Sequence, residues 1–263
     1  MFADVTSANV VGYANSSLTD GTNVTTPMFY KVGGGAVDVQ DIIPSDNAPD
    51  GGNVSSQLSF QILDKDALIV GNLTYYWHNR DVQLPFPLPS YTLKGWYTKA
   101  TPTSATDGKA VLTINPGEAV YLKCPIEGVT LGYSGEVKTS ELNISVNNGR
   151  TLVGNPFPVN YSIQNITPIG ENVPDGGQTT MQIQFQRLAK DSTVRDNVTY
   201  YWHNRDVQLP FPLPSYSLNG WYTKATPTSA TDGKATLELL PGEGVYVNCP
   251  VDGISFNFAG LDL

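Results

Sequence analysis

Charged residues are scarce in this chain, and basic residues are scarcer than acidic ones. Only 15% of the 263 residues are charged, against roughly 25% in an ordinary soluble protein. The 15 lysines and arginines are outnumbered by 24 aspartates and glutamates, so the net charge is −9. Nucleic acids and anionic lipids bind to basic faces. Neither is therefore expected as a partner.

Long apolar segments are also absent from the sequence. No apolar run approaches the roughly 18 residues that a membrane-spanning helix needs, so we expect a protein that does not span a membrane. The first residues, MFADVTSANVV, lack the basic start and the apolar stretch of a signal peptide. The polar, weakly charged composition still favours an extracellular or cell-surface protein whose numbering begins at or near a processed end.

Residue types that commonly carry catalysis are few as well. The only two histidines, His78 and His203, have neither metal-site nor catalytic-triad spacing. The acidic loops at 44–53 and 170–178 lack the bidentate glutamate of a calcium loop, so they are interpreted as turns. The sequence contains no nucleophile–base pair, metal cluster or phosphate loop. We therefore expect neither enzymatic activity nor a cofactor.

What the chain does have is internal repetition. The segment YYWHNRDVQLPFPLPSY begins at Tyr75 and again at Tyr200, an offset of 125 residues. Across residues 74–110 and 199–235, only two of 37 positions differ. The same register aligns Pro-Gly-Glu at 116–118 with 241–243. The sequence therefore predicts two equivalent domains, residues 1–136 and 137–263.

Alternating apolar and polar residues fill both repeats. Val120, Leu122 and Cys124 form one such set, and Ile254, Phe256 and Phe258 form another. Alternation places each set on one face of a strand, and frequent glycine and proline separate the strands. The predicted fold class is all-β, with two tandem antiparallel β-sandwich repeats of jelly-roll or immunoglobulin-like type.

A group of short motifs in the second repeat resembles a β module of secreted bacterial proteins. VGNPFPVNYSIQNITP is followed by TYYWHN, GWY and LPGEGVYV, so the pattern spans nearly all of residues 137–263. The first repeat keeps the later motifs but has TTPMFY in place of the Gly-Asn-Pro-Phe-Pro start. The resemblance implies β structure and an extracellular or cell-surface setting, and it implies no reaction.

The proline-rich segment QLPFPLPSY cannot be a central strand, because proline lacks the backbone donor. We expect a stiff, polyproline-like loop. Three roles are open for it: packing over the end of its own sandwich, contacting another subunit through Phe86 and Leu88, or forming a sugar-binding platform with the nearby Trp96 and Tyr97.

The cysteines occupy equivalent positions in the two repeats. Cys124 and Cys249 each end an apolar strand face and precede a proline. Repeats related by translation would hold these sulfurs too far apart for a disulfide, since bridged Cα atoms lie within about 7 Å. Only a twofold arrangement with these strands on the axis could join them. We predict two buried, unpaired thiols.

The near-identity of the two blocks has two explanations. One is a recent duplication or local recombination of this segment alone, and the other is a surface that both copies present to the same kind of neighbour. The chain ends where another repeat would start, and its N-terminus resembles the missing continuation. One subunit could therefore add its N-terminal strand to the next, which builds an open head-to-tail polymer.

The predicted function is that of an extracellular structural protein whose partners are copies of itself, assembled into a surface filament or layer. The predicted contact residues between subunits are Val5, Val10, Val11, Tyr13, Tyr76, His78, Phe86, Leu88, Tyr201, His203, Phe211, Leu213, Phe256, Phe258 and Leu261.

An adhesin or carbohydrate-binding module is the alternative prediction. Its partners would be surface glycans, which stack on exposed aromatic rings. The candidate glycan-binding residues are Trp96, Tyr97, Trp221 and Tyr222, beside the proline-rich loops.

Overall fold

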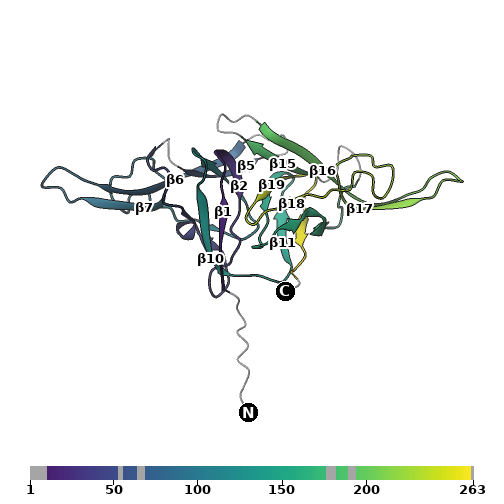
Figure 1. The fold of residues 1–263 in the computed structure, drawn as a ribbon, viewed down its shortest axis with the longest axis horizontal. Coiled ribbons are helices and arrows are strands. Elements are labelled where there is room, and N and C mark those ends of the chain that lie inside the picture. Colours follow the sequence, from purple (N-terminus) through teal and green to yellow (C-terminus); the bar gives the residue numbers. More distant parts are fainter. Residues whose placement is uncertain (1–10, 53–55, 64–68, 176–181, 189–193, 262–263) are drawn as a thin grey trace, which may run out of the picture.

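The computed structural model describes residues 11–52, 56–63, 69–175, 182–188 and 194–261. These residues form antiparallel strands joined by turns and short 3₁₀ segments, so the chain is all-β. No helix in the described part of the chain is long and apolar enough to cross a bilayer. The molecule is elongated, with one hairpin extending from each end (Figure 1).

The first repeat forms one lobe from a small and a large sheet. The small sheet has the strand order β1 (Val11–Ser17), β10 (Thr130–Glu136) and β4 (Ile43–Pro44). The first repeat's part of the large sheet has the order β2 (Gly21–Thr25), β9 (Val120–Cys124), β5 (Gln57–Leu63), β6 (Ile69–Val82) and β7 (Tyr91–Tyr97). A two-stranded pair, β3 (Val37–Asp38) and β8 (Thr113–Ile114), completes the lobe.

The second repeat builds the same arrangement again. Its small sheet has the order β11 (Leu142–Val146), β20 (Ile254–Phe258) and β14 (Ile166–Ile169). Its part of the large sheet has the order β12 (Gly149–Gly154), β19 (Gly244–Cys249), β15 (Gln182–Leu188), β16 (Val194–Val207) and β17 (Tyr216–Tyr222). The remaining pair is β13 (Tyr161–Ser162) with β18 (Glu238–Leu239).

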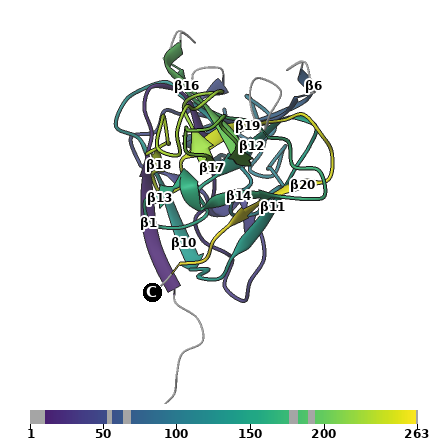
Figure 2. The same ribbon diagram turned by 90° about the vertical axis from the view of Figure 1, so that its right-hand side faces the viewer.

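Each lobe has its own hydrophobic core, which draws on both of its sheets. In the second lobe, Ile254, Phe256 and Phe258 of β20 are buried with Val245 and Val247 of β19. In the first lobe, Leu131 and Tyr133 of β10 are buried with Val120 and Leu122 of β9. Alternate residues of these strands therefore face inward, as their period of two predicts. In the view of Figure 2, β11, β14 and β20 lie below β12 and β19 of the large sheet.

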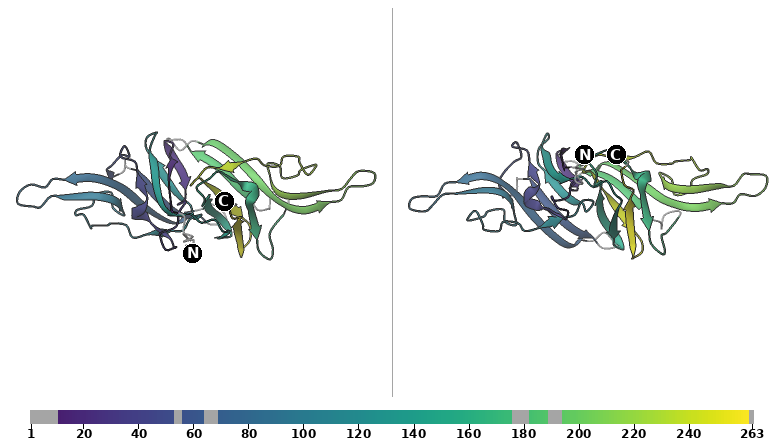
Figure 3. Two further views of the ribbon diagram at one scale, coloured as in Figure 1. Left: turned by 60° about the horizontal axis from the view of Figure 1, so that its bottom comes forward. Right: turned by 90° about the horizontal axis from the view of Figure 1, so that it is seen from below.

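The two lobes are related by an approximate twofold axis. Thr25 forms a bridge with Glu243, and the equivalent residues Val153 and Glu118 form a second bridge in the opposite sense. Such reciprocal contacts define an isologous interface. A single pair between Leu188 and Thr22 joins the two parts of the large sheet. Seen from below, the hairpins extend in opposite directions (Figure 3).

Of the two arrangements considered for the cysteines, translation is therefore excluded. Equivalent tyrosines, Tyr121 and Tyr246, meet across the junction with ring centroids 5.7 Å apart. Cys124 and Cys249 are buried and free, as predicted. Their thiols donate to the main-chain carbonyls of Ile126 and Val251 at 3.1 and 2.9 Å. Burial raises the pKa of both thiols.

The predicted addition of an N-terminal strand to a neighbouring subunit is not available to the described residues. Strand β1 already pairs with β10 of its own lobe along its whole length, from Val11 to Ser17. Strand β20 is flanked on both sides, by β11 and β14. Each lobe therefore completes its own small sheet. The predicted contact residues Val5 and Val10 lie outside the described residues.

A partly buried glutamine in each lobe, Gln40 or Gln164, fixes the position of the strand that carries the second tryptophan. The Gln164 side chain donates to the carbonyls of Trp221 and Ala235 at 2.8 and 2.9 Å, and its oxygen accepts from the Trp221 amide at 3.2 Å. Gly220 lies beside this amide at a φ of +114°, where an added Cβ would be 2.2 Å from the Gln164 oxygen.

Substituting Gly220→Ala should therefore be far more destabilising than an alanine at a glycine with open surroundings. Gly253→Ala is the matched control, because Gly253 has a φ of +77° and no atom within 4 Å of the added Cβ. The control should cost about 1–2 kcal/mol from backbone strain alone. Gly220→Ala should cost at least about 3 kcal/mol, since it also breaks hydrogen bonds of Gln164. Urea unfolding measures both, and equal costs would contradict this role for Gln164.

Candidate functional site

The two protruding hairpins, which we call the arms, are the most distinctive surface feature of the molecule. In the first arm, β5 accompanies β6 only as far as Tyr76. From Trp77 to Val82, the register of β6 is with β7 alone. The second arm, β16 with β17, repeats this pairing from Trp202 to Val207. A two-stranded ribbon of this kind is only marginally stable in water by itself.

Each arm ends in the proline-rich loop, which we call the tip (residues 83–90 and 208–215). Phe86 and Phe211 are each 98% exposed, and Leu88 and Leu213 are more than half exposed. The bonds from these phenylalanines to the next prolines are cis. Packing over its own sandwich, one of the three roles left open for the loop, is therefore excluded. The loop is also a turn and not an extended segment, since the Leu88 amide donates to the Pro85 carbonyl at 3.0 Å.

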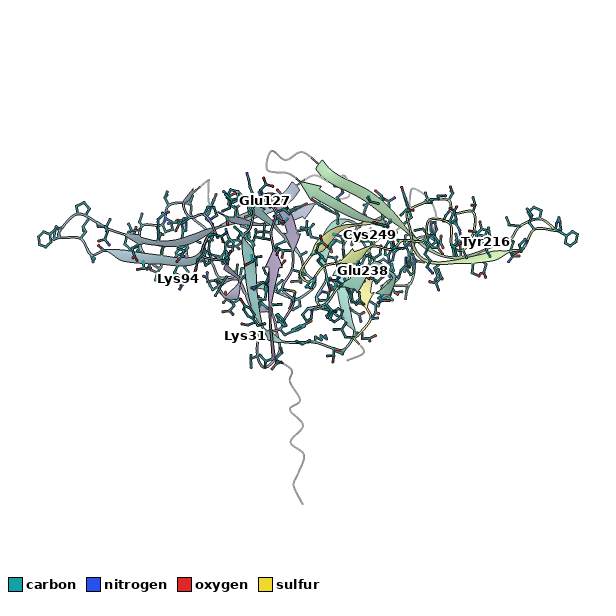
Figure 4. All side chains as sticks on the ribbon, in the orientation of Figure 1. Lys31, Lys94, Glu127, Tyr216, Glu238 and Cys249 are labelled. Carbon is teal, nitrogen blue, oxygen red and sulfur yellow. The ribbon has the colours of Figure 1, made fainter. Side chains whose placement is uncertain are left out.

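A long loop lies along each arm (residues 98–109 and 223–234), and it contacts both ends of the arm's second strand. The Tyr91 hydroxyl donates to the Pro102 carbonyl at 3.1 Å, and Tyr97 donates to Ala105 at 3.0 Å. The second arm repeats the first contact, from Tyr216 to Pro227 at 3.0 Å. Tyr216 lies along the right-hand arm in Figure 4. The loop therefore supports the ribbon of each arm as far as Tyr91 or Tyr216, directly after the tip.

An aspartate holds each supporting loop in shape. Asp107 forms an ion pair with Lys99 and accepts from the amide and hydroxyl of Thr103, both at 2.8 Å. Asp232 makes the same contacts with Lys224 and Thr228. The hydrogen bond from the lysine, followed by those from the threonine, lowers the pKa of each aspartate from 3.8 to about 2.

The base of each arm, which we call the root, is a cluster around a buried histidine. His78 is 0% exposed. Its Nδ1 lies 3.1 Å from Asp50 Oδ1, and its Nε2 lies 3.1 Å from the carbonyl oxygen of Lys99. Asp50 also accepts from the Asn79 amide at 2.5 Å and from Arg80 at 2.6 Å. The cluster thus joins β6 to the loop before β5 and to the supporting loop.

The second root reproduces the first. His203 Nδ1 lies 3.2 Å from Asp175 Oδ1, and its Nε2 lies 3.1 Å from the Lys224 carbonyl oxygen. The partner aspartates were not predicted as functional residues. The signal for them was the repeated Pro-Asp-Gly-Gly at 49–52 and 174–177, which was interpreted as turn chemistry alone.

The structure contradicts several predicted contact residues. His78, His203, Phe256 and Phe258 are fully buried within their own lobes, so they cannot contact another subunit. For the histidines, loops cover the strand face that was expected to be open. The predicted contact residues that the structure exposes are Val11, Tyr13, Phe86, Leu88, Phe211 and Leu213, and those that it leaves partly exposed are Tyr76, Tyr201 and Leu261.

The four candidate glycan-binding aromatic residues are also buried. Trp96 and Trp221 are 0% exposed, and Tyr97 and Tyr222 are 1% exposed. The indole nitrogen of Trp96 donates to the Ile42 carbonyl at 2.7 Å, so its polar group is used inside the lobe. Because sugar stacking needs an exposed ring face, these four residues do not form a glycan platform.

One cleft lies at the lobe junction, with a volume of about 330 Å³. Its lining includes Ser16 of β1 and Gly242 of the second lobe. On the opposite side of the axis, Ile144 stands at the register position of Ser16 and packs against Gly117. The position equivalent to Ser16 therefore holds a larger side chain in the second lobe. Across the described residues, no group of three His, Cys, Asp or Glu is placed to hold a metal ion.

Comparison with known proteins finds no match: no family model, no curated protein and no solved structure is similar to this chain.

Replacing Asp107 and Asp232 together with asparagine should destabilise the protein in a pH-dependent way. A lowered folded-state pKa means that the carboxylates contribute stability above their ordinary value of 3.8 and lose it as the pH falls to about 2. The loss of unfolding free energy in the double variant, relative to the wild type, should thus be largest at neutral pH. It should become smaller as the pH falls from 3.8 to about 2. Urea unfolding across this range measures it. A deficit that does not change with pH would show that the aspartates do not act through their charge.

Proposed function

We propose that this protein is an extracellular, non-enzymatic structural subunit that assembles with copies of itself into a filament or layer, and that the arm tips make the contacts. The observation that carries this proposal is the exposure of Phe86 and Phe211, each 98% exposed at the end of an arm. An aromatic side chain offers a large apolar area and few rotatable bonds, so it loses little entropy when it docks.

The identity of the two tips supports contacts between like ends. Residues 83–90 and 208–215 have the same sequence, and the twofold arrangement directs the arms to opposite ends of the molecule (Figure 3). A contact between two identical tips is isologous. A subunit with one such tip at each end can bind one neighbour through each tip. The resulting polymer is open-ended, because every terminal subunit still has an unoccupied tip.

Ribbon edges near the tips could add main-chain hydrogen bonds to this contact. Beyond Trp77, β6 is in register with β7 alone, so each strand of the outer ribbon has one side without a partner strand. Exposed edges of this kind are templates for pairing with another chain. Two ribbons lying edge to edge would form a four-stranded sheet shared between subunits. Each would then gain the neighbours that an isolated ribbon lacks.

The affinity of one contact should be modest. A tip presents a small area, and interfaces below about 1,200 Å² are usually weak or transient. Assembly should therefore depend steeply on protein concentration. This dependence separates the proposal from a monomeric adhesin, which would remain a single two-armed particle at every concentration.

The proposal is tested by removing the tips one at a time. Wild-type protein, Phe86→Ser, Phe211→Ser and the double variant would be compared by sedimentation velocity and negative-stain microscopy over a range of concentrations. We expect extended assemblies from the wild type, no species larger than dimers from either single variant, and monomers from the double variant. Substitutions at such exposed positions should change stability by less than about 0.5 kcal/mol.

Val111→Ser is the matched control. Val111 is 93% exposed but lies in the supporting-loop region away from the tip. The control should assemble like the wild type. Wild-type protein that stays monomeric at high concentration, or a double variant that assembles as well as the control, would contradict the proposal.

A further inference from the structure

The two roots place a histidine where both ring nitrogens face hydrogen-bond acceptors. In the first root the acceptors are the carboxylate of Asp50 and the main-chain carbonyl of Lys99, each 3.1 Å away. In the second they are Asp175 and the Lys224 carbonyl, at 3.2 and 3.1 Å. Neither a carbonyl nor an ionised carboxylate can donate a hydrogen bond.

This geometry discriminates between the protonation states of the ring. A neutral imidazole carries one N–H, so it can satisfy only one of the two acceptors and turns a lone pair toward the other. A protonated imidazolium carries two N–H groups and satisfies both. With the ring 0% exposed, water has little access to replace a missing contact, and an unsatisfied buried polar group is costly.

The charged and titratable groups around each ring are few. Around His78 they are Asp50 and, through it, Arg80, whose Nη1 lies 2.6 Å from the same carboxylate oxygen. The Tyr97 ring packs edge-on at 5.4 Å, and the Lys99 ammonium points to Asp107. His203 has the equivalent set: Asp175, Arg205 at 3.3 Å, the Tyr222 ring, and Lys224 with Asp232. One carboxylate thus lies between the histidine ring and an arginine in each root.

We propose that each root is a proton-dependent latch that fixes the arm to the body when its histidine is protonated and loosens it when the histidine is neutral. The latch joins three segments of the chain through one ring: β6, the loop holding Asp50, and the supporting loop that begins near Lys99. The inference goes beyond the proposed function and does not depend on it, because it concerns the attachment of the arms and not what their tips contact.

The direction of the pH effect follows from which form the folded protein prefers. A root that favours the imidazolium stabilises the fold at mildly acidic pH, and this contribution is lost as the pH rises and the ring gives up its proton. Histidine is the side chain that ordinarily changes charge between about pH 5 and 8. The latch should therefore hold in mildly acidic solution and loosen toward alkaline pH.

The whole chain offers an unusually clean test, because it contains only two histidines. Nitrogen NMR of protein labelled at histidine reports both roots, and a His203→Gln variant leaves the first root alone. We expect two ring N–H groups per histidine at about pH 5.5 and one at alkaline pH, within the range in which histidine titrates. Rings that remain neutral, with one N–H from mildly acidic to alkaline pH, would overturn the proposal without any variant being needed.

Amide hydrogen exchange tests whether loss of the proton loosens the arm. The Asn79 amide donates to Asp50 in the root, at 2.5 Å. Its protection factor, corrected for the intrinsic effect of pH, should fall about tenfold or more as the ring becomes neutral, the size expected from one charge-assisted hydrogen bond. Unchanged protection across the titration would contradict the latch.

Asp50→Asn separates a charge effect from packing, with Asp81→Asn as the matched control. Asp81 lies on the same strand, exposed, and accepts from Thr92 at 2.6 Å. We expect Asp50→Asn to abolish the pH-dependent change at Asn79 and Asp81→Asn to leave it intact. A pH profile for Asp50→Asn equal to that of the wild type would overturn the role given to the carboxylate.

Discussion

The reciprocal contact between the two lobes is the constraint on which the shape of this protein depends. Tyr121 packs on its counterpart Tyr246, and the flanking bridges, Thr25 with Glu243 and Val153 with Glu118, are the same contact made twice. Burial raises the pKa of both tyrosines, since the phenolate form would be poorly solvated at the junction. Because this contact is twofold, the two arms extend in opposite directions.

Much of the local structure could be predicted from the sequence because a strand's two faces differ in polarity. The placement of Ile254, Phe256 and Phe258 on one face of β20 is confirmed, since all three are buried. His78 was predicted to contact another subunit, yet it is fully buried. Its partners, Asp50 and the Lys99 carbonyl, lie 28 and 21 positions away in loops, and no short-range pattern reports that such loops cover a strand.

The spatial relation of the repeats could not be predicted from the sequence, for a physical reason. A repeat in the sequence predicts that two segments fold alike. It does not predict the symmetry operation, such as a translation or a rotation, that relates the two folded lobes. That operation depends on how β2 and β9 of the first lobe pack against β12 and β19 of the second. Nearby, Thr22 of β2 pairs with Leu188 of β15. The proline loop shows a similar limit. Its prolines were enough to exclude a central strand. Its exposure could not be predicted, because it follows from a two-stranded ribbon that extends beyond the rest of the sheet.

The molecule combines two lobes, arms attached at a histidine root and apolar tips at opposite ends. The opposed direction of the arms can be tested directly by single-molecule energy transfer. Dyes would be placed pairwise at Ser90 and Ser215, exposed residues of the two tips, and at Ser145 on the exposed face of β11, with Cys124 and Cys249 buried. The account predicts a tip-to-tip distance longer than either distance to Ser145. A tip-to-tip distance shorter than both would contradict it.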